Sequence, residues 1–166
     1  MLDPLNGSSH RALGYALVVA RRYGEAATAL EDSISLDPDY KEAYGDRGLA
    51  FYGAGDLERA RASCETKRDQ WESRKCLAMV YDKLGRHADA EAELEKFKSA
   101  YGNAFAYEYA SIYAQRGDRT KALEWLDTAV RLRDPGLSNL KTDALLDPLR
   151  NEPRFQAIER ALKFPE

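Results

Sequence analysis

YASIYAQRGDRTKALEWLDTAVRL, the sequence from Tyr109 to Leu132, holds two amphipathic runs of helical spacing that are broken at Gly117-Asp118. Gly117 can adopt the left-handed conformation that ends a helix, because it has no Cβ to clash with the backbone. Asp118 can cap the following helix by accepting a backbone N–H. Four residues later, Ala122 offers a small side chain at which two helices can approach closely. The stretch therefore predicts a helical hairpin.

The same unit recurs in three earlier stretches, RRYGEAATAL (21–30), GAGDLERARASC (53–64) and KLGRHADAEAEL (83–94). Its small residue falls at Ala26, Ala60, Ala90 and Ala122, with separations of 34, 30 and 32 residues. A period near 34 residues is the pattern of tetratricopeptide repeats. In the first unit Arg21 occupies the position that glycine holds in the others, so this turn is less ideal.

The chain resembles the tetratricopeptide repeat family over about residues 7–134. Small residues stand at the positions where the two helices of a repeat meet, namely Gly14, Gly48, Ala78 and Ala110. Two residues depart from the family pattern: His10 stands where the family often has Trp, and Cys64 where it often has Phe or Leu. The resemblance implies an all-α fold, a right-handed α-solenoid of about four helix-turn-helix repeats.

We expect repeats at about residues 7–40, 41–70, 71–102 and 103–134, followed by a helical cap at 135–166. Four of the six prolines lie from Pro135 onward, so the composition changes there. In this tail we expect a short helix near Leu145 to Leu149 and a last helix from Pro153 to Leu162, with Asn151 as its N-cap. Apolar residues of the tail would cover the stacking face of the last repeat.

The triplet Leu2-Asp3-Pro4 matches Leu36-Asp37-Pro38, which closes the first repeat. It therefore looks like the tail of a repeat whose body is missing, and we expect a single domain that is a fragment of a longer protein. An ordinary N-terminal loop is the alternative. The stretch LLDPLRNEPRF, residues 145–155, resembles the end of tetratricopeptide regions in large bacterial regulators, where the repeats follow an adenylate cyclase, winged-helix or kinase domain.

Bulk composition excludes several classes of protein. The net charge of −3 and pI of about 5.6 argue against a nucleic-acid binder, which needs a basic face. No apolar run approaches the length of a membrane span, and the start lacks the features of a signal peptide. Cys64 and Cys76 fall within helical runs, so we expect reduced thiols, no disulfide scaffold and a cytoplasmic location.

Nothing in the sequence predicts an enzyme, a cofactor or a metal. His10 and His87 lie in different repeats and are interpreted as structural residues. No HExxH, CxxC or GxSxG motif occurs. Gly53-Ala54-Gly55 begins like a dinucleotide-binding fingerprint, but Glu58 holds the third glycine position and a helix precedes it. We interpret one group of carboxylates as a solvated helix face, namely Glu91, Glu93 and Glu95.

In the tetratricopeptide repeat family, the first helices of successive repeats line a concave groove. The resemblance implies that the groove-facing residues here are Arg11, Tyr15, Val18, Asp46, Leu49, Tyr52, Lys75, Met79, Asp82, Tyr107 and Ser111. Aromatic and Met side chains on such a wall suit a peptide, although several could instead pack against the second helices. The positions that hold a carboxylate in chaperone-binding members are Arg11, Tyr15, Asp46, Glu72 and Cys76. Two of these are acids, so chaperone-tail recognition is not expected.

The predicted function is a protein-interaction scaffold that binds a partner peptide or domain in the groove. The alternative is a structural or oligomerisation module of a bacterial signalling protein such as an adenylate cyclase or transcriptional regulator. If the preceding repeat is missing, the first helix would lose its neighbour, so we expect self-association through Ala12, Leu13, Ala16 and Val19.

Overall fold

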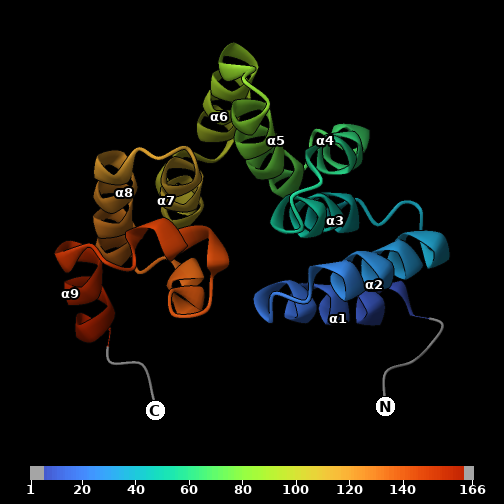
Figure 1. Cartoon of the computed structure of the whole chain (residues 1–166), viewed down its shortest axis with the longest axis horizontal. Helices are drawn as coiled ribbons and strands as arrows, with labels where there is room; N and C mark the ends of the chain where they lie inside the picture. The colour runs from blue at the N-terminus through green and yellow to red at the C-terminus, as the bar shows by residue number, and fades with distance from the viewer. Residues whose placement is uncertain (1–5, 163–166) are drawn as a thin grey trace. The chain divides into compact units, whose positions relative to one another are not determined.

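The computed structural model describes residues 6–162, and within that range it contains helices and no strand (Figure 1). Eight helices form four consecutive hairpins: α1 (Gly7–Val19) with α2 (Tyr23–Leu36), α3 (Glu42–Gly53) with α4 (Leu57–Thr66), α5 (Trp71–Lys83) with α6 (His87–Tyr101), and α7 (Ala106–Gln115) with α8 (Arg119–Leu132). Short 3-10 segments lie at η1 (Gly102–Phe105), η2 (Pro135–Asn139) and η3 (Ala144–Leu149), and α9 (Pro153–Ala161) follows. The expected all-α class with helix–turn–helix repeats is confirmed.

The chain divides into two compact units, one ending at Phe97 and the other beginning at Lys98, so the boundary falls within α6. In the first unit α2 packs against α1 and α3, and α4 against α3 and α5. In the second unit α8 packs against α7, η2 and α9. The predicted single-domain organisation stays a prediction. The triplet at residues 2–4 lies outside the described residues.

Glycine takes the left-handed conformation in three of the four hairpin turns, as predicted. Gly117 has a φ of 82°, and the carboxylate of Asp118 accepts the N–H of Lys121 at 3.0 Å. At the first hairpin Arg21 takes the same left-handed conformation with a φ of 60°, and the next residue, Arg22, makes no side-chain cap. A left-handed backbone costs an L-residue about 1–2 kcal/mol. The first turn is therefore the strained one.

Small residues set the contact between the two helices of each hairpin. The four anchor alanines, Ala26, Ala60, Ala90 and Ala122, are fully buried. A methyl group added to Gly14 would lie 2.4 Å from Cγ of Leu30. Since real Cβ atoms do not approach so closely, only glycine lets α1 pack on α2 in this way. The period read from the alanines thus corresponds to helix–helix contacts.

The expected cap is present in the second unit. Its buried apolar residues are Leu137, Leu140, Leu146, Leu149, Phe155 and Ile158. Helix α9 begins at Pro153 as predicted, but its N-cap is Glu152, without a side-chain hydrogen bond, and not Asn151. Before the short helix the tail contains η2, where the side chain of Asp134 accepts the N–H of Gly136.

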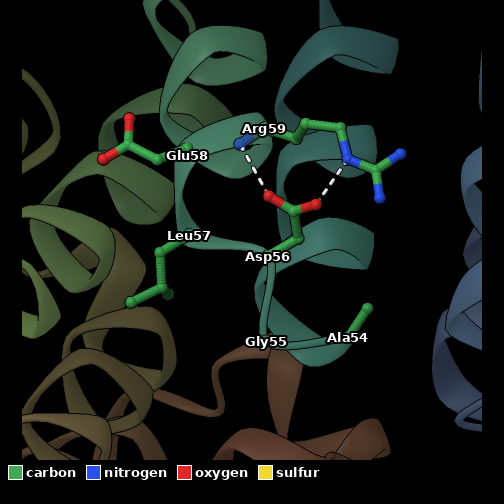
Figure 2. A pocket seen from close by; sticks show the side chains of 6 residues that line it. All are labelled: Ala54, Gly55, Asp56, Leu57, Glu58 and Arg59. Atoms are coloured by element: carbon green, nitrogen blue, oxygen red, sulfur yellow. Dashed lines mark hydrogen bonds and ion pairs between the residues drawn. The ribbon is translucent and has the colours of Figure 1, made fainter.

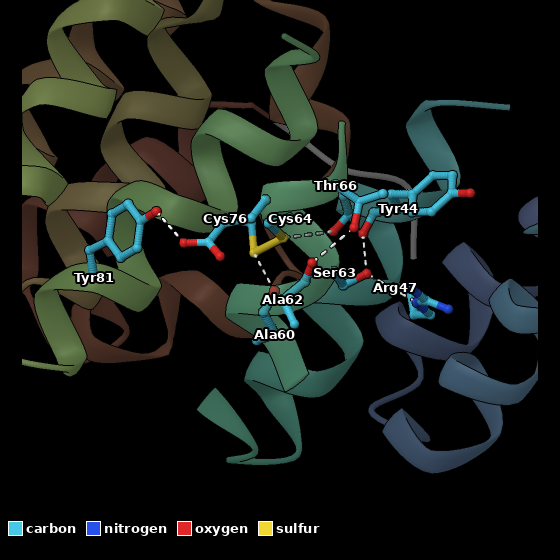
Figure 3. Close-up of a disulfide and its surroundings, with 11 residues drawn as sticks. Tyr44, Arg47, Ala60, Ala62, Ser63, Cys64, Thr66, Cys76 and Tyr81 are labelled. Atoms are coloured by element: carbon cyan, nitrogen blue, oxygen red, sulfur yellow. Dashed lines mark hydrogen bonds between the residues drawn. A yellow bond between two sulfur atoms is a disulfide. The ribbon is translucent and has the colours of Figure 1, made fainter. Parts of the chain in front are cut away.

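The expectation of reduced thiols is wrong, because Cys64 and Cys76 form a disulfide (Figure 3). Cys64 lies on α4 and Cys76 on α5, and the link between the two helices spans only residues 67–70. So short a link folds α5 back along α4 and brings the two buried positions together. Helical location, on which the expectation of reduced thiols rested, does not show which cysteines the repeat geometry makes neighbours.

Candidate functional site

The first helices of the first three hairpins lie side by side and form the face that we call the first-helix wall, made of α1, α3 and α5. Arg11 on α1 joins all three. Its Nε donates to Oδ2 of Asp46 on α3 at 2.7 Å, and an Nη donates to Oε1 of Glu72 on α5 at 3.3 Å. The guanidinium also stands over the ring of Tyr40, 5.6 Å from its centroid. The charges at the base of the wall are therefore paired with one another.

Burial dominates the electrostatics of this cluster. Burial alone would lower the pKa of Arg11, but the charge of Asp46 and the hydrogen bonds that Arg11 makes raise it overall. Burial raises the pKa of Asp46, against the opposing charge of Arg11. It also raises the pKa of Glu72 to about 7, and the second carboxylate oxygen of Glu72 is buried without a hydrogen-bond partner. The cluster thus includes a carboxylate, Glu72, whose charged form is disfavoured by burial.

Only some of the predicted groove residues are exposed on the wall. Tyr15 has 46% of its surface exposed, and Leu49 and Tyr52 are partly buried against the core around the disulfide. Met79 is fully buried, so its predicted contact with a partner is wrong for this structure.

Three charged groove candidates contact other residues of the protein. Asp46 and Lys75 are buried, at 4% and 6% exposure, and Lys75 contributes a favourable charge to Asp46. Asp82 contacts Nδ1 of His87 at 2.8 Å. Helical periodicity placed these residues on the first helices correctly, but it could not tell a wall-facing side chain from one between two first helices.

The prediction that Tyr107 faces a groove is wrong. It is 1% exposed, and its hydroxyl donates to Oδ2 of Asp143 at 3.0 Å. Its backbone N–H donates to Oδ2 of Asp134 at 3.0 Å, and a methyl group on Gly136 would collide with its ring. Tyr107 therefore anchors the cap to α7. Its partners Asp134 and Asp143 lie 27 and 36 positions further along the chain, so no local sequence pattern connects them to Tyr107. Two candidates remain. Val18 packs against the core of the first unit, and the hydroxyl of Ser111 donates to the backbone carbonyl of Glu108.

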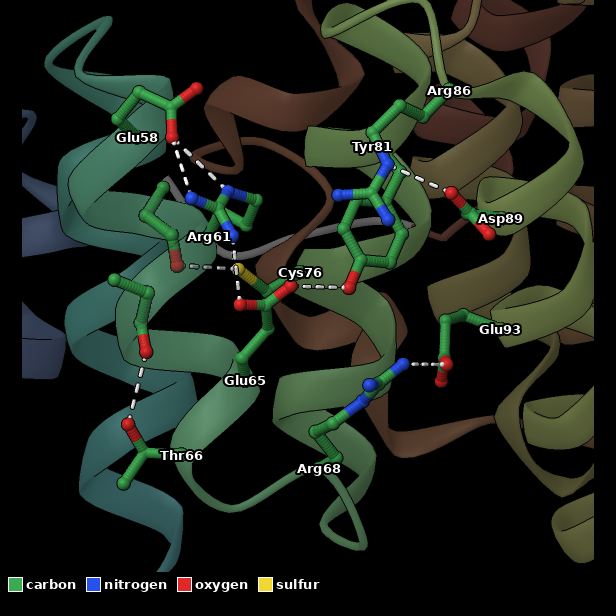
Figure 4. A network of polar contacts seen from close by, with 12 residues as sticks. Glu58, Arg61, Glu65, Thr66, Arg68, Cys76, Tyr81, Arg86, Asp89 and Glu93 are labelled. Atoms are coloured by element: carbon green, nitrogen blue, oxygen red, sulfur yellow. Dashed lines mark hydrogen bonds and ion pairs between the residues drawn. The ribbon is translucent and has the colours of Figure 1, made fainter.

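Sequence reasoning missed a second charged site around Glu93 (Figure 4). Glu93 on α6 is 2% exposed, so its interpretation as part of a solvated face is wrong. It accepts from Arg68 at 2.7 Å, Arg74 at 3.2 Å and Lys96 at 3.1 Å. Burial would raise the pKa of Glu93, but the hydrogen bonds from Arg68 and Lys96 hold it below its usual value. The burial of Glu93 could have been predicted from helical spacing, because Glu93 falls on the same face of α6 as the buried residues Ala90 and Phe97.

A neighbouring chain of polar contacts joins α4 to α5 (Figure 4). Arg61 donates to both Glu58 and Glu65, its neighbours along α4. Tyr81 of α5 donates its hydroxyl to Oε1 of Glu65 at 2.7 Å, and burial, with this hydrogen bond, raises the pKa of Tyr81 to about 12. These contacts and the disulfide hold the second and third hairpins together.

The glycine-containing turn does not form a dinucleotide site (Figure 2). The surface depression there is lined by six consecutive residues, Ala54 to Arg59. Asp56 fills the N-terminus of α4, accepting the N–H of Arg59 at 3.0 Å and its Nε at 2.5 Å. A carboxylate at this place would repel a phosphate.

No group of three or more His, Cys, Asp or Glu side chains among residues 6–162 could hold a metal ion. Every helix described is too short or too polar to cross a bilayer.

Comparison with known families agrees with the geometry. A family model described as tetratricopeptide repeat matches residues 11–70 and 77–136. No curated protein matches the chain.

Proposed function

Because the chain belongs to the tetratricopeptide repeat family, we propose that it is a protein-interaction scaffold whose first-helix wall binds a partner peptide or domain. Members of this family generally mediate contacts between proteins. The observation that carries the proposal for this wall is Tyr15, a large amphipathic side chain that is 46% exposed on α1. Aromatic side chains of this kind contribute much contact area at little cost in conformational entropy.

The chemistry of the wall favours an apolar anchor on the partner. Arg11 is occupied by Asp46 and Glu72, so these charges compensate one another within the protein. Leu49 and Tyr52 offer partly exposed apolar surface on α3. We therefore assign the contact to Tyr15, Leu49 and Tyr52, with Arg11 as a polar neighbour, and assign the buried residues of the predicted groove a supporting role.

Helix α1 exposes a second face that supports a second candidate function. Leu13 and Tyr15 lie about 200° apart around the helix axis, since each residue turns it by about 100°. Leu13 is 37% exposed, and its neighbours Ala12 and Ala16 are exposed too. Self-association through this face would make the chain an oligomerisation module, as in a bacterial signalling protein with an adenylate cyclase or a transcriptional regulator. Disulfides persist mainly in oxidising compartments, so the Cys64–Cys76 bond argues against the cytoplasmic location expected from the sequence.

The two functions are separated by substitutions on opposite faces of α1. Peptides selected from a random library on the wild-type chain serve as probes, with affinity measured by fluorescence anisotropy. Tyr15→Ala should weaken their binding by about 10-fold. Leu132→Ala, which removes an apolar side chain 48% exposed on α8, is the matched control and should leave binding unchanged. Equal binding by the wild type and Tyr15→Ala would remove the wall from consideration.

Self-association is tested on the same chain without a ligand. Light scattering over a concentration series should give a rising mass if α1 is the interface, and Leu13→Lys should restore the monomer. A constant monomeric mass in the wild type would reject the second candidate and leave the first untouched.

A further inference from the structure

The disulfide lies at the meeting point of three helices (Figure 3). Cys64 of α4 and Cys76 of α5 are both fully buried and stand 12 residues apart. On α3, a methyl group added to Gly48 would lie 1.9 Å from Sγ of Cys64 and 2.9 Å from Sγ of Cys76. The backbone of α3 therefore rests directly on the sulfur pair, without space to spare.

The pair also adjoins the first-helix wall, because Cys76 lies on α5 and both sulfurs pack against Gly48 of α3. Gly48 precedes Leu49 on α3, and Cys76 follows Lys75 on α5. Two unbonded sulfur atoms need more room than two bonded ones, and the close contact with Gly48 leaves little of it, so reduction should loosen the packing of α4 and α5 against α3. The state of the pair is thus coupled to the packing of α3, α4 and α5.

The surroundings also fit the reduced state. The carbonyl oxygen of Gly45 lies 3.9 Å from Sγ of Cys64, and that of Ala60 lies 3.8 Å from Sγ of Cys76. In the disulfide neither sulfur carries a proton, so these are plain contacts. After reduction each thiol finds a carbonyl acceptor at the distance of a weak S–H···O hydrogen bond. Two buried thiols would therefore not be left without partners.

We propose that the Cys64–Cys76 pair is a redox-responsive lock, whose reduction loosens the junction of α3, α4 and α5 while the chain stays folded. A dithiol supplies the electrons. One of its thiolates attacks one cysteine sulfur, the protein S–S bond breaks, and a mixed disulfide forms. The second dithiol sulfur then displaces the cysteine, leaving two protein thiols and the oxidised, cyclic reagent. The two protons of the dithiol end on Cys64 and Cys76.

The first test measures the pair and its exchange chemistry. Alkylation of the air-oxidised chain followed by mass spectrometry should find no free thiol in either cysteine. With dithiothreitol, reduction should be at least 10-fold slower in the folded chain than in urea, because both sulfurs are buried. Free thiols in the air-oxidised chain, or a bond that dithiothreitol cannot reduce while the chain stays folded, would overturn the proposal.

The second test measures whether reduction loosens the junction of α3, α4 and α5. The reduced chain should keep its helical circular dichroism, while its folding equilibrium constant falls by about 100-fold, the effect of opening a loop of this length. Amide exchange should accelerate in α4 and α5 far more than in α7 and α8. Cys64→Ala/Cys76→Ala is the control and should not respond to dithiothreitol. A reduced chain that unfolds, or one whose α4 and α5 amides exchange as in the oxidised chain, would contradict the proposal. These measurements need no binding partner, so they are independent of the proposed function.

Discussion

Replacing Glu93 by Gln tests whether a buried carboxylate organises the junction between the link 67–70, α5 and α6. The change keeps the shape of the side chain and removes its charge, which leaves Arg68, Arg74 and Lys96 facing one another. Removing one partner of a buried ion pair costs about 3–5 kcal/mol. Arg68 and Lys96 are 49% and 56% exposed and can regain water, so we expect a loss of about 2–3 kcal/mol.

Urea unfolding followed by circular dichroism measures this loss, and a melting temperature lower by about 4–12 °C should accompany it. The sign of the pH dependence follows from the lowered pKa of Glu93. The stability it contributes is present above the pKa of an unfolded Glu and is lost as the pH falls through the folded value. Glu95→Gln, two residues further along α6 and exposed, is the control and should change stability by less than about 0.5 kcal/mol. Equal stability of the two variants would show that the ion pairs of Glu93 contribute nothing measurable to the stability of the fold.

Three further predictions concern single residues of the repeats. Arg21→Gly should stabilise the chain by about 0.5–1 kcal/mol, because glycine adopts the left-handed turn without strain; a destabilised variant in urea would contradict this. Ala122→Leu should cost about 1–3 kcal/mol by overpacking the α7–α8 contact, and an unchanged melting temperature would show the register to be wrong. Between pH 4.5 and 7 the folded chain retains a proton on Glu72 that the unfolded chain releases, so stability should fall as the pH rises. Glu72→Gln should reduce this fall, and an unaltered profile of urea midpoints would refute it.

The fold could be predicted because local and repeated signals agree. Gly117, Asp118 and Ala122 each have a local physical reason for their place. The full set recurs at Gly55, Asp56 and Ala60, and the alanine recurs at a nearly constant period in all four units. The cap could be located from its prolines and apolar clusters, since Pro153 begins α9 as expected. Arg21 shows the strength of the pattern, because the backbone keeps the left-handed turn even where the side chain opposes it.

The site was harder to predict, because it depends on contacts between repeats. The pairing of Arg11 with Asp46 and Glu72 spans 35 and 61 residues. Helical spacing identifies the helix face of each residue, but it does not say whether a neighbouring helix covers that face. Met79 and Tyr107 were placed on the correct helices and are nevertheless buried. The disulfide was missed for the same reason, since it joins two helices across a turn.

The claim that the first-helix wall binds protein is tested most directly by mapping a bound peptide on the isotope-labelled chain by NMR. A library-selected peptide should shift the amide signals of α1 and α3 around Tyr15, Leu49 and Tyr52, with little change in α8. The same titration on Tyr15→Ala should need about 10-fold more peptide. Shifts centred on Leu13 and Ala16, or on α8, would contradict the account and place the binding surface elsewhere.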